Sequence, residues 1–405
     1  MLIFRMALRN LLRNRRRTLL TGLMMAGGYT LFSATLALSD GTYGSIIDMF
    51  TRSRTGHAQV HAKGYLDKPS LYRSISGLDR VARVLDARKE VKAWAPRVYT
   101  PALAFAGSKT VGAQVMGIDP ARERRAMRLE SQLAAGSFIP DRLSDGAVIS
   151  ARLASALNLK PGDEFSLIGQ GADGSIANDN FRVAGVLSAT ESSFEGPWCL
   201  VHIDKAREFL ALGAKAHEIA LVFTDYRKAR EDAALVGAAL ADPALDTEPW
   251  QVTEKEFYQA MLLDKKGGDI TNFIIMCIVA VGVLNTVLMA VLERTREYGV
   301  LKALGTRPAF IFGLIMAEVT LLALAAAAAG ALLSLGLNRY LSVHGIPIPE
   351  PISYGGVKFT RMISSVTAFS FIRPAYTVLA AALIVGVFPA LKAARITPIK
   401  ALGSR

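Results

Sequence analysis

Four long stretches of this chain carry almost no charged side chains, and they constrain the fold more than any other feature. Residues 18–39, 270–292 and 374–391 contain no charge, and residues 308–338 are interrupted by Glu318 alone. A helix needs about 20 mainly apolar residues to cross roughly 30 Å of hydrocarbon. A buried core helix would explain one such run but not four. We therefore predict four transmembrane helices.

The first run has an alternative interpretation as a cleaved secretory signal. It follows a basic segment, residues 1–17, as the apolar part of such a signal does. That apolar part is about 7–15 residues long, whereas this run has 22 residues, and Ala34 and Ala37 offer only a poor cleavage site. We interpret residues 18–39 as a retained helix.

The distribution of charge predicts the orientation in the membrane. The net charge of +13 is compatible with nucleic acid, a membrane surface or a membrane protein with basic inner loops. Residues 1–17, 293–307 and 392–405 together hold 14 Lys and Arg in 46 residues and a net charge of +12, whereas 40–269 and 339–373 hold 33 in 265 residues and a net charge of +2. The positive-inside rule predicts that the first set and both termini are cytoplasmic. The charge is then mainly an orientation signal, and no nucleic-acid partner is expected.

Residues 40–269 are long enough for a large domain outside the cytoplasm, and their pattern alternates between strand-like and helix-like segments. We expect strands at 57–61, 98–105, 111–118, 164–168, 181–187, 199–203 and 219–223. We expect helices at 78–89, 150–157, 205–212, 227–240 and 253–266, with Ser150 and Asp204 as N-caps. The fold class is thus a four-helix membrane protein with a large α+β extracytoplasmic domain inserted between helices 1 and 2. A loop at 339–373 would join helices 3 and 4 outside.

Apparent catalytic and metal-binding patterns in the outer segment are weak. Residues 169–174 (GQGADG) match a nucleotide-binding pattern, but a polar stretch and a strand follow instead of the helix that would hold phosphate, so we expect a hairpin loop. His57 and His61 would lie about 13 Å apart on a strand and could not share a metal ion. Cys199 and Cys277 fall in the outer and membrane segments and cannot pair. We expect neither a catalytic site nor a metal site.

The predicted cytoplasmic segments carry the most informative patterns. Residues 1–17 form an amphipathic helix with apolar residues on one side and arginines on the other, as expected at an anionic membrane surface. In 293–307 the helix should continue past the membrane until Gly299 breaks it. Its apolar residues Val300, Leu301, Ala303 and Leu304 indicate a docking surface for a cytoplasmic partner.

Polar and small residues inside the predicted helices indicate how the helices pack. Glu318 and Asn285 lie at similar depth, so we predict a hydrogen bond between them across helices 2 and 3. Small residues recur every four positions at Ala326, Gly330 and Ser334 and again at Ala382, Gly386 and Ala390. This spacing permits close helix packing.

Three motifs resemble the FtsX-like ABC transporter permeases, the group that includes MacB and the lipoprotein-releasing LolC and LolE proteins. They are residues 285–305 (NTVLMAVLERTREYGVLKALG), 7–18 (ALRNLLRNRRRT) and 393–402 (AARITPIKAL). One helix, a large outer domain and then three helices is also the order of that family. Residues 56–60 (GHAQV) resemble the lipoprotein-releasing branch.

The resemblance implies a non-catalytic permease subunit of a mechanotransmission ABC transporter in a cell inner membrane. It implies pairing with a second permease copy, identical or not, and docking to a cytoplasmic ABC ATPase dimer. The coupling residues would be Glu293, Arg294, Glu297, Gly299, Lys302 and Gly305. The chain lacks a P-loop motif, so ATP and Mg²⁺ are expected on a separate ATPase subunit.

The preferred function is lipoprotein release toward the outer membrane, with a lipoprotein substrate and a periplasmic acceptor as partners. The alternatives are an efflux permease for peptides or small amphiphiles and a divisome-type signalling subunit that controls a periplasmic partner. A membrane-anchored enzyme lacks any catalytic cluster in the sequence.

Overall fold

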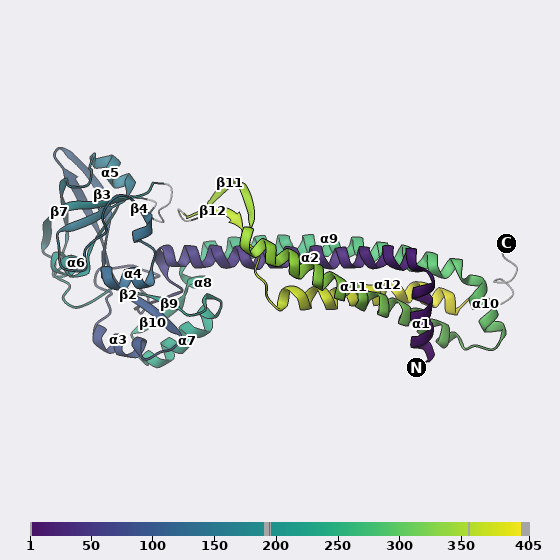
Figure 1. Cartoon of the computed structure of the whole chain (residues 1–405). Coiled ribbons are helices and arrows are strands. Elements are labelled where there is room, and N and C mark those ends of the chain that lie inside the picture. The colour runs from purple at the N-terminus through teal and green to yellow at the C-terminus, as the bar shows by residue number, and fades with distance from the viewer. Residues whose placement is uncertain (1, 190–193, 195, 355–356, 398–405) are drawn as a thin grey trace. The chain divides into compact units, whose positions relative to one another are not determined.

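The computed structural model describes residues 2–189, 194, 196–354 and 357–397, and the chain divides into two compact units (Figure 1). The helical unit contains the described residues of 1–44, 261–347 and 361–405, and the sheet unit contains those of 45–260 and 348–360. Residues 398–405 of the predicted tail, with the end of the third motif, lie outside the described residues.

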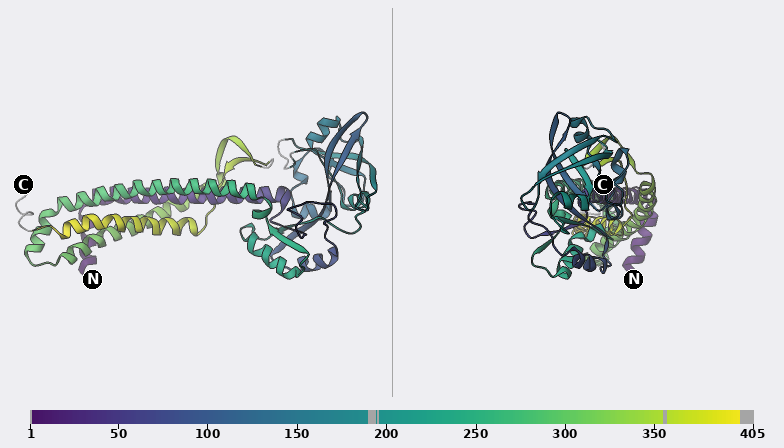
Figure 2. Two further views of the ribbon diagram at one scale, coloured as in Figure 1. Left: turned by 180° about the vertical axis from the view of Figure 1, so that it is seen from behind. Right: turned by 90° about the vertical axis from the view of Figure 1, so that its left-hand side faces the viewer.

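The helical unit is built around four long helices that run side by side in Figure 1 and, from behind, in Figure 2. These are α2 (Arg15–Phe50), α9 (Lys255–Glu293), α11 (Pro308–His344) and α12 (Phe369–Ala394). All four are long and apolar enough to cross a membrane. They coincide with the four predicted runs but extend beyond them, and the membrane boundaries remain a prediction. Two shorter helices, α1 (Leu2–Arg13) and α10 (Thr295–Ala303), lie at one end.

Small residues allow these helices to approach closely. Ala326, Gly330 and Ser334 lie on the buried face of α11, and Ala382, Gly386 and Ala390 on the buried face of α12. A Cβ at Gly330 would lie 2.9 Å from the Tyr29 side chain of α2. Both rows of small residues therefore pack inward, as their spacing predicts.

The structure corrects the predicted separation between a helix at 253–266 and a membrane helix from 270. A short helix, α8 (Trp250–Thr253), precedes α9, which runs without a break through Gly267 and Gly268. Hydrogen bonds to α2 hold α9 on both sides of these glycines: the Tyr43 hydroxyl bonds Asp264, and Thr35 Oγ1 bonds Asn272 Oδ1 at 2.7 Å. These contacts offset the free-energy cost of placing glycine inside a helix, which is about 1 kcal/mol per residue relative to alanine.

The sheet unit contains a ten-stranded mixed sheet, whose elements lie between α2 and α9 in chain order. The strands follow the path β10-β1-β9-β2-β3-β8-β5-β7-β4, and β6 pairs with both β2 and β7. Their bounds are β1 Ala58–Ala62, β2 Val91–Ala106, β3 Lys109–Ile118, β4 Leu133–Gly136, β5 Gly146–Ile149, β6 Glu164–Gln170, β7 Ile176–Leu187, β8 Trp198–His202, β9 Glu218–Phe223 and β10 Leu245–Pro249.

Together with α8, the sheet unit contains α3 (Leu78–Asp86), α4 (Pro120–Ala126), α5 (Ala151–Leu157), α6 (Ile203–Phe209) and α7 (Ala229–Leu240). Ser150 caps α5 as predicted, because its Oγ accepts a hydrogen bond from the Leu153 N–H at 3.2 Å. The predicted cap at Asp204 is wrong. Strand β8 leads directly into α6, so His202 occupies the N-cap position.

Two predictions about loops have different outcomes. Residues 169–174 belong to the antiparallel β6–β7 hairpin, where Gly171 and Ser175 are joined by a backbone hydrogen bond, so the hairpin interpretation is confirmed. The segment 339–373 is more ordered than a loop. It contains the end of α11, the two-stranded sheet of β11 (Ile346–Tyr354) and β12 (Val357–Met362), and the start of α12.

Candidate functional site

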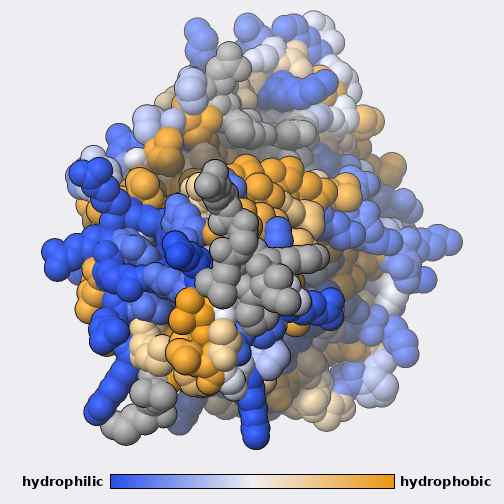
Figure 3. Space-filling view, turned by 90° about the vertical axis from the view of Figure 1, so that its right-hand side faces the viewer, coloured by the Kyte–Doolittle hydropathy of each residue, from blue (hydrophilic) through white to orange (hydrophobic). Residues whose placement is uncertain are grey.

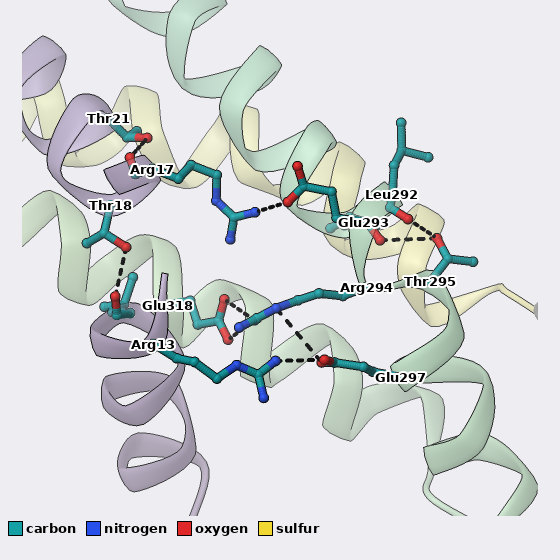
Figure 4. Close-up of polar contacts among 12 residues, drawn as sticks. Arg13, Arg17, Thr18, Thr21, Leu292, Glu293, Arg294, Thr295, Glu297 and Glu318 are labelled. Carbon is teal, nitrogen blue, oxygen red and sulfur yellow. Dashed lines mark hydrogen bonds and ion pairs between the residues drawn. The ribbon is translucent and has the colours of Figure 1, made fainter. Parts of the chain in front are cut away.

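One end of the helical unit brings together charged side chains that are far apart in the sequence. Helix α1, the start of α2, the end of α9, α10 and the start of α11 meet there (Figure 4). Helix α1 packs along α11. The segments 1–17 and 293–307, both predicted to be cytoplasmic, therefore lie at the same end.

Glu318 of α11 forms the centre of this cluster. Its Oε1 accepts a hydrogen bond from Asn10 Nδ2 of α1 at 2.6 Å and one from the Arg294 guanidinium at 3.2 Å. The Arg294 and Glu318 side chains are only 6% and 13% exposed. An intramembrane or partly buried carboxyl group normally has such a partner. The Glu318 carboxylate thus joins α1 and α11 to the junction between α9 and α10.

The predicted hydrogen bond between Asn285 and Glu318 is not formed in the described helical unit. The buried stripe of α9 includes Val283, Val287 and Val291. Asn285 lies two residues from Val283, which is about 200° around a helix at 3.6 residues per turn. Its side chain is therefore exposed and points away from the packed face.

Two further ion pairs, both exposed to solvent, connect residues 1–17 to α9 and α10. Arg13 contacts Glu297 at 2.6 Å, and Arg17 contacts Glu293 at 2.7 Å. All four side chains are between 24% and 55% exposed. Pairs in such positions usually contribute about 0–1 kcal/mol each. They orient the segments more than they stabilise them.

Lys302 joins α10 to the last helix of the chain. Its Nζ donates hydrogen bonds to the carbonyl oxygens of Ala394 and Ile396, at 2.9 and 2.8 Å. These groups lie at the C-terminal end of α12, which ends at Ala394. A cation there satisfies free carbonyl groups and interacts favourably with the helix dipole.

The helix break predicted at Gly299 occurs elsewhere. Arg294, with φ −103° and ψ 13°, separates α9 from α10, and Gly299 is a buried residue within α10. The end of α10 is instead set by Gly305, whose φ is +87°. The Gly305 and Thr306 N–H groups bond the carbonyls of Lys302 and Leu301, which is the Schellman pattern that favours glycine.

Helix α10 leaves an apolar face exposed. Val300 is 44% exposed and Leu304 is 79% exposed, with the exposed Ala303 between them and Arg296 and Arg307 nearby in the chain. Figure 3 looks onto this end, where hydrophobic residues reach the surface beside hydrophilic ones. Leu301, which was expected in this patch, packs against the core of the helical unit. The exposed surface of α10 is therefore narrower than predicted.

The six predicted coupling residues separate into two groups. Glu293, Glu297 and Gly305 are exposed, whereas Arg294 and Gly299 are buried and Lys302 is partly buried against α12. The sequence interpretation missed Asn10, Arg13 and Arg17 as partners of this segment. Only the repeated arginines of residues 1–17 signalled them, and that pattern does not identify which carboxylate each contacts.

The sheet unit holds a different polar cluster. Arg97 is fully buried and contacts Glu123 at 2.6 Å and Glu218 at 3.0 Å. Glu218 also accepts a hydrogen bond from the Tyr99 hydroxyl at 3.1 Å. These groups satisfy one another, so the cluster is suited to holding β2, β9 and α4 together.

The histidines and cysteines of the described residues form no reactive arrangement. Burial lowers the pKa of His57 to about 4, and its Nδ1 accepts a hydrogen bond from the Phe223 N–H at 3.0 Å. No group of three or more His, Cys, Asp or Glu side chains within the described ranges is placed to hold a metal ion. Cys199 is buried in the sheet unit, Cys277 is exposed on α9, and both are free thiols.

Comparison with known proteins matches both units to families. A family model for the C-terminal part of FtsX-like permeases matches residues 270–398, and one for the MacB-like periplasmic core domain matches residues 18–241. The lipoprotein-releasing system transmembrane protein LolC of Neisseria meningitidis is 24% identical over 271 residues, which cover 65% of this chain and 63% of LolC.

A second curated relative aligns along nearly the whole chain. The pyoverdine export ATP-binding/permease protein PvdT of Pseudomonas syringae pv. tomato is 26% identical over 402 residues, which cover 96% of this chain and 58% of PvdT. The chain thus spans less than two thirds of both relatives. Among solved structures, the periplasmic region of MacB from Actinobacillus actinomycetemcomitans aligns with 53% of this chain and 98% of its own, at 14% identity and a TM-score of 0.38.

Proposed function

Because this chain belongs to the family of FtsX-like permeases with a MacB-like periplasmic core domain, we propose that it is the membrane subunit of a mechanotransmission ABC transporter. In this proposal the chain lies in a cell inner membrane with both termini in the cytoplasm. It pairs with a second permease copy and docks a cytoplasmic ATPase dimer, which carries the ATP and Mg²⁺. The chain itself acts without catalysing a reaction.

The exposed face of α10 is the observation that carries this proposal. Leu304 is 79% exposed and Val300 is 44% exposed at the turn between two long helices. A loop with no partner would gain nothing from apolar side chains placed in water. Glu297 and Arg296 border this face and supply charges for a polar rim of the kind found at protein interfaces.

The contacts behind this face make α10 a defined docking element. Arg294 anchors the start of α10 to Glu318 on α11, and Lys302 anchors its end to the last carbonyls of α12. A push on α10 by a partner would therefore act on two of the long helices. Glu293, Arg294, Glu297, Gly299, Lys302 and Gly305 form the coupling segment in this proposal, with the buried members positioning the exposed ones.

The proposed substrate is a lipoprotein released from the inner membrane toward a periplasmic acceptor. The similarity to LolC, over 65% of this chain, supports this substrate class. The alignment with PvdT, over 96% of this chain, favours a second candidate, the export of a peptide or small amphiphile. A signalling subunit that controls a periplasmic partner is the third alternative.

The first experiment copurifies the full chain with candidate ATPases from its own source and measures ATP hydrolysis of the complex in proteoliposomes. The second measures lipoprotein release to a soluble acceptor from the same vesicles with ATP and with a non-hydrolysable analogue. We expect an ATPase to copurify and ATP to drive release. Copurification without release would support efflux or signalling, and the absence of any ATPase partner would overturn the transporter proposal.

A further inference from the structure

A basic groove lies where α1 meets α2, against the end of α9. It is open to solvent and has a volume of about 840 Å³. Its lining consists of Arg13, Asn14, Arg15, Arg16, Arg17, Leu20, Asn285, Thr286, Met289 and Glu293. All of these residues belong to the helical unit. Glu293 also belongs to the proposed coupling segment, and the other lining residues lie outside that segment.

The groove keeps a positive charge that nearby carboxylates do not neutralise. Arg13 and Arg17 are engaged by Glu297 and Glu293. Arg15 and Arg16 are exposed and form no ion pair with any residue that the structure describes. The two unpaired guanidinium groups therefore remain available to an anion.

The start of α2 adds to this positive potential. Asn14 separates α1 from α2, which begins at Arg15 and has no acidic residue in its first turn. The first N–H groups of a helix lack intrahelical partners and carry the positive end of the dipole. The exposed Asn285 amide offers a further hydrogen-bond donor from α9. The arginine side chains, the Asn285 amide and the first residues of α2 thus line one groove.

Apolar side chains continue the groove on the side away from the arginines. Leu20, about one turn after Arg17 on α2, is 68% exposed, and Met289, about one turn before Glu293 on α9, is 54% exposed. Leu23, one turn further along α2, is 56% exposed. A free phosphate ion would contact none of this surface. A ligand with a phosphate at one end and a hydrocarbon chain at the other would contact all of it.

The position of the groove agrees with such a ligand. The arginines immediately precede the predicted span 18–39, and Met289 lies near the end of the predicted span 270–292. The groove therefore crosses the expected boundary between hydrocarbon and water. Arginines at that level attract anionic lipids by about 1 kcal/mol each.

We propose that this groove binds one anionic phospholipid of the leaflet in which α1 lies. Arg15, Arg16 and the start of α2 hold its phosphate, Asn285 donates to the headgroup, and the acyl chains lie against Leu20 and Met289. The exposed Asn285 thereby has a role as a headgroup ligand in place of its predicted pairing with Glu318.

The test compares two double variants that remove the same charge from the full chain. R15Q/R16Q removes the unpaired arginines of the groove, and R5Q/R9Q removes two exposed arginines of α1 that do not line it. Native mass spectrometry of the purified protein measures binding of added phosphatidylglycerol and phosphatidylcholine. We expect R15Q/R16Q to weaken phosphatidylglycerol binding roughly 10- to 30-fold, since each arginine contributes about 1 kcal/mol. R5Q/R9Q should change it less than about threefold, because diffuse charge effects are weak in salt.

Two further measurements separate a lipid from free phosphate and from a general charge effect. M289S should weaken phosphatidylglycerol binding, and millimolar inorganic phosphate should fail to displace the lipid. N285L should also weaken binding while leaving the arginines intact. Equal losses in the two double variants, or displacement of the lipid by inorganic phosphate, would overturn the proposal. None of these outcomes depends on an ATPase partner.

Discussion

Arg294 and Glu318 form a largely buried ion pair 3.2 Å apart, which joins the junction between α9 and α10 to the side of α11. The pair is shielded from water, in contrast to the exposed Arg13–Glu297 pair beside it (Figure 4). The same end of the molecule thus contains one contact that holds helices together and others that only orient them.

The Arg294→Met variant should be much less stable than the wild type, by about 3 kcal/mol, because it leaves Glu318 buried without its cation. The Arg13→Met variant removes an exposed pair and should lose less than about 1 kcal/mol. Equilibrium unfolding of the full chain in detergent measures both. R294M/E318Q should recover most of the loss, since no uncompensated charge remains. Equal losses for Arg294→Met and Arg13→Met would contradict the distinction between the two pairs.

The Leu304→Glu variant should abolish binding of the proposed cytoplasmic ATPase while leaving the fold intact. Leu304 is 79% exposed, so a charge there costs little in the isolated chain but would be buried in the docked complex. Copurification and thermal stability report the two effects separately. Leu143→Glu, at a residue 57% exposed in the sheet unit, is the matched control and should bind normally. Wild-type binding by Leu304→Glu would remove α10 from the interface.

Two glycines of α11 should respond oppositely to alanine. A Cβ at Gly330 would meet the Tyr29 ring at 2.9 Å, whereas one at Gly336 would meet nothing within 4 Å. We expect Gly330→Ala to destabilise the helical unit by about 1–3 kcal/mol through overpacking. Gly336→Ala should be neutral or stabilising by up to about 1 kcal/mol, because alanine favours the helix. Thermal unfolding decides between them, and a stabilising Gly330→Ala would show that α2 and α11 can separate without cost.

Acid should destabilise the sheet unit through His57. Burial lowers the pKa of His57 to about 4, compared with 6.5 for an unperturbed histidine. As the pH falls from about 6.5 toward 4, the unfolded chain binds a proton that the folded state resists, so the free energy of unfolding decreases by about 3 kcal/mol. The stabilising contribution is complete only above pH 6.5. Unfolding followed by tryptophan fluorescence across this range measures the loss, and His57→Gln should flatten the profile if His57 is responsible.

Much of the local structure was predictable because it depends on local pattern. Every predicted strand of residues 40–269 overlaps a strand of the sheet, with alternating or β-branched residues as the signal. The missed strands β4, β5 and β10 have only four or five residues each. Their hydrogen bonds come from β7, β8 and β1. A short segment takes its structure from a partner, and the chain around it does not identify that partner.

In the candidate site, too, the helices follow from local pattern, whereas the contacts between side chains do not. The uncharged runs and the clustered arginines of residues 1–17 and 293–307 identified four long helices and a polar end. Which side chains meet at that end depends on how each helix is rotated about its axis. Asn285 lies about 200° around α9 from the buried Val283 and therefore points away from the packed face. The helix break at Arg294 places the Arg294 side chain next to Glu318.

The number of long apolar helices and the location of the sheet domain along the chain can be predicted from local pattern, because hydrophobic length and alternation are local properties. Gly305 ends α10 through a local Schellman motif. The folded structure was needed to establish that Gly267 and Gly268 remain helical and that Arg294 turns inward. Each of these depends on contacts between residues distant in the chain. Hydrogen bonds to α2 and to the carboxylate of α11 outweigh the local preferences of these residues.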